Sequence, residues 1–125
     1  MTPENILNAA RGVLKQRGRC IGQFKTEDGR VDLPGALAIA DGAEADMWLF
    51  WRGFEFEELD TNTRAVIEAA RLLAEVMAPL QPVRTMSLNQ LVALLGDASD
   101  TLSGTQIDDF LKQAASLAAQ RGIAA

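Results

Sequence analysis

Apolar side chains recur at helical spacing near the start of the chain, with mainly polar side chains between them. The apolar positions are Ile6, Leu7, Ala10, Val13 and Leu14. Thr2 suits the N-cap, Pro3 suits the first helical position, and Gly18 suits the residue after the last turn. The pattern therefore predicts an amphipathic helix over residues 3–17.

Two helix-start signals of the same kind occur in the last third of the chain. Both are capping boxes, in which each side chain binds the other residue's backbone N–H. They pair Ser87 with Gln90 and Ser103 with Gln106. Gly96 is expected to end the first helix and Gly122 the second. These signals predict a helical hairpin over residues 87–121.

Two more helices are expected between these segments. Asp32 can cap a short helix over residues 33–40, with Pro34 in its first turn. A second apolar stripe follows the caps available in residues 60–63, and Pro79 stops it. Its members are Val66, Ala69, Ala70, Leu73, Val76 and Met77.

The remaining segments have weaker patterns. Asp28-Gly29 between two short β-prone runs is typical of a tight turn and allows a small β-hairpin over residues 21–31. The apolar run Met47-Trp48-Leu49-Phe50-Trp51 suits a buried helix or a strand, and we expect a helix over residues 44–52. Residues 54–57 alternate between phenylalanine and glutamate, which favours extended chain.

Length and composition indicate one domain. The chain has 125 residues, of which 48% are hydrophobic and 23% charged, as in ordinary globular proteins. We therefore expect a mainly α fold over residues 1–125, a helical bundle of about five helices. An apolar run of about 18 residues is missing, as are the features of a secretory leader, so we expect a cytoplasmic protein and no membrane association.

Missing residue types restrict the chemistry. The chain has no histidine and one cysteine, which excludes the usual Ser-His-Asp and Cys-His mechanisms and ordinary zinc sites. The acids of residues 97–109 do not have the spacing of an EF-hand loop. Cys20 lies near Arg17 and Arg19, which would lower its pKa, but without a base partner a buried structural thiol is the better interpretation. We expect no catalytic residue, metal or cofactor.

Charge is unevenly distributed along the chain. Residues 1–31 carry six basic and three acidic side chains, whereas residues 32–60 carry one basic and eight acidic ones. The basic set is a candidate for nucleic-acid binding, and consists of Arg11, Lys15, Arg17, Arg19 and Lys25. Because the chain has a net charge of −5, a solvated face that neutralises the acidic part is the better interpretation, and we expect no direct nucleic-acid binding.

Residues 41–60 combine aromatic and acidic side chains. They hold five of the seven aromatic residues and seven of the seventeen acids. Aromatic residues anchor protein interfaces, and surrounding carboxylates favour a basic partner. We expect about half of the aromatics in the core and one or two exposed, with Trp48 or Trp51 as an anchor. The candidate partner-binding residues are Glu44, Asp46, Trp48, Trp51, Glu55, Glu57 and Glu58.

Several motifs follow one another in an order that is similar to a known family. They are Gly18-Arg19-Cys20, Gly22, Gly35-Ala36-Leu37-Ala38-Ile39-Ala40-Asp41-Gly42 and Leu94-Leu95-Gly96-Asp97. The chain resembles an uncharacterised family of small proteins from actinobacteria and their phages. It departs from that family where Leu33-Pro34-Gly35 replaces Cys-Leu-Gly and where Leu95-Gly96-Asp97 replaces Trp-Asn-Asp. The resemblance implies a phage or mobile-element setting and supplies no catalytic residues.

These observations favour a non-catalytic protein-binding module. By analogy with small acidic proteins of phages, we expect an inhibitor or anti-defence protein, similar to anti-CRISPR proteins, that covers a basic surface of its partner. The alternatives are a small enzyme that uses carboxylates and a structural or assembly subunit, and a homo-oligomer is compatible with all three. Two acids converging in a pocket with separated pKa values would indicate the enzyme.

Overall fold

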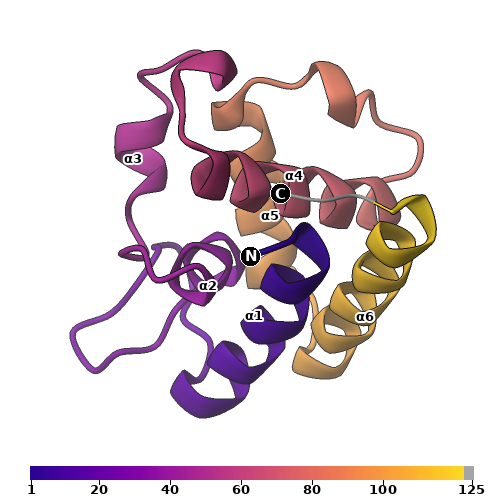
Figure 1. Ribbon diagram of the computed structural model, residues 1–125. Helices are drawn as coiled ribbons and strands as arrows, with labels where there is room; N and C mark the ends of the chain where they lie inside the picture. The colour runs from indigo at the N-terminus through magenta and orange to yellow at the C-terminus, as the bar shows by residue number, and fades with distance from the viewer. Residues whose placement is uncertain (123–125) are drawn as a thin grey trace.

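Six α-helices and two short 3₁₀ helices make up the computed structural model, which describes residues 1–122 (Figure 1). In chain order they are α1 (Pro3–Arg17), α2 (Leu33–Ala40), α3 (Trp48–Trp51), η1 (Phe56–Glu58), α4 (Thr61–Met77), η2 (Val83–Thr85), α5 (Leu88–Thr101) and α6 (Gly104–Arg121). This part of the chain contains no β-strand, so the prediction of a mainly helical bundle is confirmed.

Local hydrogen bonds set the helix ends. α1 and α2 begin and end where the sequence predicts. Both capping boxes form: the N–H of Gln90 donates to Ser87 Oγ at 3.2 Å, and the N–H of Ser87 donates to Gln90 Oε1 at 2.9 Å. Ser103 and Gln106 make the same exchange at 3.1 and 2.9 Å. These helix starts were predictable because the groups that form them are three residues apart.

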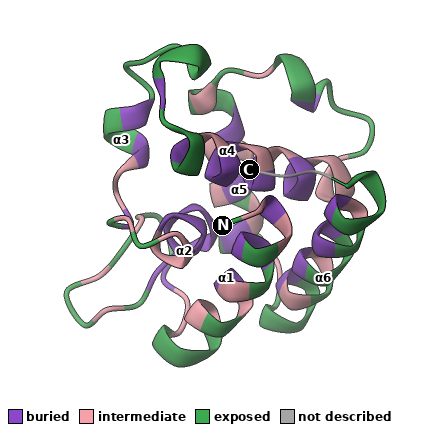
Figure 2. Ribbon diagram, in the orientation of Figure 1, coloured by how far each residue is buried: buried purple, intermediate pink, exposed green. Residues whose placement is uncertain are grey.

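The core forms around α4. This helix packs against α1, α2, α5 and α6, while α1 also packs against α2 and α6. Figure 2 shows the buried sides of these helices facing one another in the middle of the molecule, with exposed residues on their outer sides. The fully buried large side chains include Ile6, Leu37, Ile67, Leu95 and Leu111, which come from five different helices.

The prediction that the last two helices pack against each other as a helical hairpin is wrong. Gly96 lies inside α5, which continues to Thr101, and only Leu102 and Ser103 join it to α6. α6 packs on α1 and α4 instead of folding back along α5. A glycine inside a helix costs only ~1 kcal/mol relative to alanine, and the continuation of α5 beyond Gly96 buries Ser99, whose Oγ accepts the N–H of Leu33 at 3.1 Å.

The segment between α1 and α2 forms a tight turn, but its two sides do not pair as β-strands. The N–H of Thr26 donates to Arg30 O at 2.9 Å, and Gly29 takes φ +90°, as a tight turn requires. Val31 makes one isolated bridge with Arg19 and one with Lys25, and no strand pair is present in the described residues of this segment. The hairpin over residues 21–31 is therefore reduced to its turn.

The acidic and aromatic segment is less regular than predicted. The helix expected over residues 44–52 is shortened to α3, with turns at residues 45–47. The extended chain expected over residues 54–57 is interrupted because η1 begins at Phe56. The N–H of Glu55 donates to Glu58 Oε1 at 2.8 Å, and this local bond fixes the start of η1.

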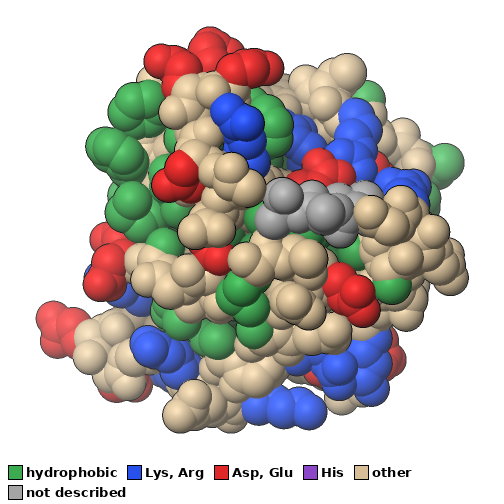
Figure 3. Space-filling view, in the orientation of Figure 1, with side chains coloured by type: hydrophobic (Ala, Val, Ile, Leu, Met, Phe, Trp, Pro, Cys, Tyr) green, Lys and Arg blue, Asp and Glu red, His purple; other side chains and the backbone are tan. Residues whose placement is uncertain are grey.

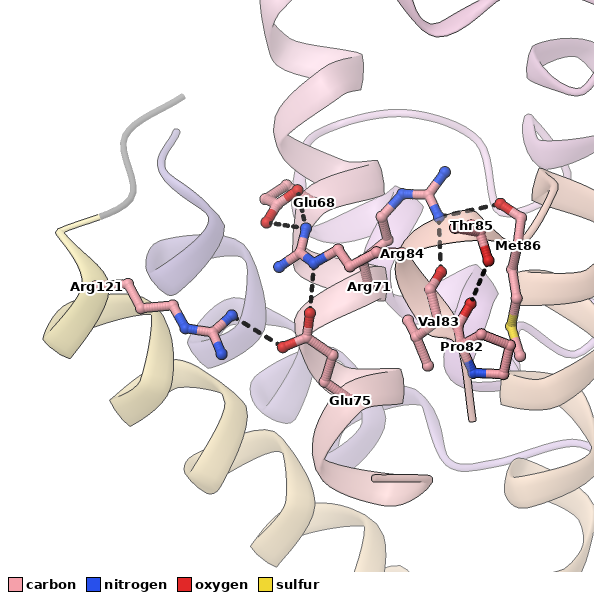
Figure 4. A network of polar contacts seen from close by, with 9 residues as sticks. All are labelled: Glu68, Arg71, Glu75, Pro82, Val83, Arg84, Thr85, Met86 and Arg121. Atoms are coloured by element: carbon pink, nitrogen blue, oxygen red, sulfur yellow. Dashed lines mark hydrogen bonds and ion pairs between the residues drawn. The ribbon is translucent and has the colours of Figure 1, made fainter. Parts of the chain in front are cut away.

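Arginines attach the α4–α5 connection and the end of α6 to α4 (Figure 4). Arg71 Nη1 donates to the carbonyl oxygens of Val83 and Met86, both at 3.1 Å, and so holds η2 in place. Arg84 pairs with Glu68 at 2.6 Å and also with Glu75.

Glu75 also joins the end of α6 to this network. Its Oε2 accepts from Arg121 at 2.9 Å. The salt bridges of the network are partly exposed, so they orient the elements more than they stabilise them.

None of the helices in residues 1–122 has the length and apolar character needed to cross a bilayer.

Candidate functional site

α3 has a buried side and an exposed side (Figure 2). Trp48 and Trp51, three residues apart, point into the core and are only 1% and 4% exposed. Their ring centroids lie 5.1 Å apart in an edge-to-face arrangement, and Trp48 Nε1 donates to Pro34 O at 2.7 Å. The expectation that one of these tryptophans is an exposed anchor is therefore wrong: both are core residues that fasten α3.

Three phenylalanines occupy the exposed positions instead. Phe50, Phe54 and Phe56 are 58%, 40% and 41% exposed. The rings of Phe50 and Phe54 pack against each other with centroids 5.0 Å apart, while the Arg64 guanidinium lies 5.7 Å from the centre of the Phe56 ring. Figure 3 shows hydrophobic side chains gathered at the surface over α3.

Carboxylates lie directly beside these rings. Glu55, Glu57 and Glu58 alternate with or follow the phenylalanines in and around η1, and all three are exposed. In Figure 3 acidic side chains cover the top of the molecule, next to the hydrophobic group over α3. We call Phe50, Phe54, Glu55, Phe56, Glu57 and Glu58 the aromatic–acidic surface.

Two of the predicted acids lie beside Lys25. Glu44 and Asp46 flank Lys25, at 3.9 and 3.8 Å from its Nζ. These long contacts between exposed groups contribute little to stability. The structure thus divides the seven predicted residues into three groups: two buried tryptophans, two acids beside Lys25, and three glutamates beside the phenylalanines.

A groove runs along one side of the aromatic–acidic surface. It has a volume of about 490 Å³, and Phe50, Phe54 and Glu58 contribute to its walls. Asp41 and Asp60 also line it. Burial raises the pKa of Asp41, and the nearby Asp60 carboxylate raises it further, whereas the N-terminal ammonium acts in the opposite direction. A cation entering the groove would meet aromatic walls and several carboxylates.

The sequence contains a signal for the exposed phenylalanines. Residues three apart share a helix face, so a short helix that buries Trp48 and Trp51 must turn Phe50 towards solvent. The orientation of Phe54 and Phe56 has no such signal, because it depends on the turn at residues 52–55 and on η1.

The other sequence candidates have structural roles. Cys20 is 2% exposed and its Sγ donates to Gln23 O at 3.1 Å. Burial, followed by the nearby Asp32 carboxylate, raises the pKa of this thiol, which fits the interpretation as a buried structural thiol. Within residues 1–122, no three acidic or cysteine side chains are grouped so that they could hold a metal ion.

A small hollow bears on the carboxylate-enzyme alternative. Asp32 and Asp100 both line a space of about 240 Å³ between the α1–α2 connection and α5. Burial raises the pKa of Asp32 to about 6, and Asp100 contributes to that rise. Each carboxylate also has a structural bond: Asp32 Oδ1 accepts the N–H of Gly35 at 2.8 Å, and Asp100 Oδ1 accepts that of Gly22 at 3.1 Å. The hollow is smaller than a typical ligand pocket, so the enzyme stays the second candidate.

The raised pKa of Asp32 predicts a distinct pH dependence of stability. The folded chain holds this proton more tightly than the unfolded chain, so the stabilisation is fully present only below the ordinary pKa of 3.8 and is lost as the pH rises from there through about 6. The loss is expected to reach about 3 kcal/mol by pH 7. Asp32→Asn keeps an oxygen for the Gly35 N–H and removes the titration.

Urea unfolding of both proteins at pH 4.5 and pH 7 tests this. The stability of Asp32→Asn relative to the natural chain should rise between these pH values. A difference between the two proteins that does not change with pH would show that Asp32 titrates normally.

The comparisons with known proteins give a family and no activity. Neither the curated proteins nor the solved structures contain a match to the chain. Residues 1–117 match the model of a family of unknown function, DUF6197. The match extends from the start of α1 into α6 and so includes both the aromatic–acidic surface and the Asp32 hollow. The chain therefore belongs to the family of unknown function DUF6197.

Proposed function

We propose that this chain is a non-catalytic protein-binding module whose aromatic–acidic surface binds a basic surface of a protein partner. The observation that carries the proposal is the set of three exposed phenylalanines beside three exposed glutamates. Exposed aromatic rings clustered on one face mark interaction sites more often than scattered apolar residues do.

The two kinds of side chain have different roles in such an interface. Phe50 and Phe54 would supply the apolar area that slows dissociation once water is excluded. Glu55 and Glu57 would speed and orient the encounter with a basic partner. The groove beside Glu58 suits a lysine or arginine of the partner, whose aliphatic stem would lie against the rings while its charge faces the carboxylates.

The proposed action is to cover the partner's basic surface. In a phage or mobile-element setting, which the sequence resemblance supports, such a module acts as an inhibitor or anti-defence protein. A cytoplasmic location agrees with this role. The carboxylate enzyme around Asp32 and an assembly subunit are the alternatives.

Affinity capture from the native host, followed by mass spectrometry, tests the proposal with three baits. One bait is the natural chain, the second carries Glu55→Lys and Glu57→Lys, and the third carries Glu27→Lys and Asp109→Lys. The third bait has the same change in net charge at exposed positions outside the surface. Glu58 is left unchanged because its Oε1 accepts the backbone N–H of Glu55, a bond whose donor Glu55→Lys leaves in place.

We expect one partner to be retained by the natural and third baits and depleted with the second. With the purified partner, Phe50→Ala should speed dissociation about tenfold or more, whereas the glutamate reversals should mainly slow association. Raising the salt concentration should also slow association. A partner held equally by all three baits, or an affinity that does not depend on salt, would contradict the proposal.

A further inference from the structure

A hollow with a volume of about 520 Å³ lies between α1 and α6, away from the aromatic–acidic surface. Leu14, Ile107 and Leu111 form its apolar floor, and Ile107 and Leu111 belong to the core. Arg11, Lys15 and Arg19 contribute three positive charges to its rim. We call this hollow the α1–α6 groove. None of its residues belongs to the aromatic–acidic surface.

Two of the three cations are held in place by the fold. Arg11 Nε donates to Asp108 Oδ1 at 2.8 Å, and Asp108 also contacts Lys112 at 3.5 Å. The hydrogen bond from Arg11 lowers the pKa of Asp108, so this carboxylate stays ionised. Arg19 donates to the carbonyl oxygen of Leu102, which joins α5 to α6.

Lys15 remains the accessible charge of the rim. It is exposed and lies one helical turn after Arg11 on α1. Its ammonium pairs with no carboxylate among residues 1–122. Counting Arg11, Lys15 and Arg19 against Asp108, the groove carries a net charge of +2 in a chain whose net charge is −5. In Figure 3 basic side chains gather at the lower edge, where α1 ends and α6 begins.

We propose that the α1–α6 groove binds a small organic anion, a carboxylate or phosphate attached to an apolar body. The volume lies in the range of small-molecule sites, which combine an apolar lining with a few charged groups that fix orientation. The apolar body would cover Leu14, Ile107 and Leu111. The anionic group would face Lys15 and the outer N–H groups of the two arginines.

The small number of basic side chains in the groove favours a small anion over a nucleic acid. A polyanion needs basic side chains along an extended surface, since its affinity grows with the number of phosphates neutralised. Here three basic side chains line one groove together with the Asp108 carboxylate, which would repel a polyanion. This site also accounts for part of the basic set of residues 1–31, which the proposed partner surface does not use.

Titration of the full chain with decanoate and with decyl phosphate tests this proposal, with decanol as the neutral control of the same length. The readout is calorimetry together with the amide NMR signals of Gly104 and Thr105, which line the groove. We expect saturable binding of one anion per chain, at least about tenfold tighter than decanol. Either anion binding in this way supports the proposal, and the tighter one identifies the head group.

Lys15→Glu should weaken anion binding about tenfold or more, because it replaces an attractive charge with a repulsive one. Lys25→Glu makes the same charge change at an exposed position outside the groove and should bind as the natural chain does. Failure of both anions to saturate, equal affinity for decanol, or an unchanged affinity in Lys15→Glu would overturn the proposal. So would tighter binding of a ten-residue oligothymidylate at Gly104 and Thr105.

Discussion

Trp48→Ala is expected to lower the free energy of unfolding by about 4 kcal/mol, the largest effect of any substitution considered for this chain. Trp48 is 1% exposed, its ring packs against Trp51, and its indole N–H binds the carbonyl oxygen of Pro34 in α2. The substitution would open a cavity between α3 and α2 and leave that carbonyl without its partner.

Two comparisons separate the causes of this loss. Trp48→Phe keeps most of the packing and removes the bond to Pro34, so it is expected to cost about 1–2 kcal/mol. Phe50→Ala, on the exposed side of the same helix, is expected to cost less than about 1 kcal/mol. Urea unfolding measures all three. Equal losses for Trp48→Ala and Phe50→Ala would show that α3 does not bury its tryptophans.

Gly35→Ala is expected to destabilise the chain by about 3 kcal/mol, which is large for the addition of one methyl group. A Cβ at residue 35 would lie 2.5 Å from the carbonyl oxygen of Phe24 and 3.2 Å from the Cβ of Ala45. The first contact is with backbone, so it cannot be relieved by a side-chain rotation. α2 would have to move away from the α1–α2 connection, which it contacts through Asp32 and Phe24.

Gly96→Ala is the matched control. A Cβ at Gly96 meets nothing within 4 Å, and the residue lies inside α5. Alanine should therefore raise the free energy of unfolding by about 0.5–1 kcal/mol through helix propensity. The opposite sign at Gly96 would indicate that α5 ends there, as the sequence alone predicts. A neutral effect at Gly35 would mean that α2 is not held close to Phe24.

The features that could be predicted from the sequence are those fixed by groups a few residues apart. Ser87 and Ser103 each bind a glutamine three residues later, so the starts of α5 and α6 follow from the sequence. The packing of α6 on α1 and α4 depends on groups far apart in the chain, such as Arg11 and Asp108, and no local pattern encodes it. Gly96 misled the prediction because glycine is compatible both with a helix end and with a helix interior.

The sequence predicts where in the chain the candidate site lies, but not which of its side chains are exposed. The density of aromatics and acids in residues 41–60 identifies the segment. Which side chains face solvent depends on where the four-residue helix α3 docks, and the burial of Trp48 and Trp51 together with the bond from Trp48 to Pro34 fixes that position. The tryptophans are therefore buried and the phenylalanines exposed, so Glu55 and Glu57 lie at the surface beside aromatic rings other than the predicted ones.

The burial of both tryptophans in α3 determines how the chain fluoresces. The chain has two tryptophans and no tyrosine, so its near-ultraviolet emission excited at 295 nm comes from one helix of four residues. Two indoles packed edge to face away from water emit at shorter wavelength than hydrated ones. A red shift that precedes the loss of helical circular dichroism during denaturation would therefore record α3 leaving α2 while the other helices are still folded.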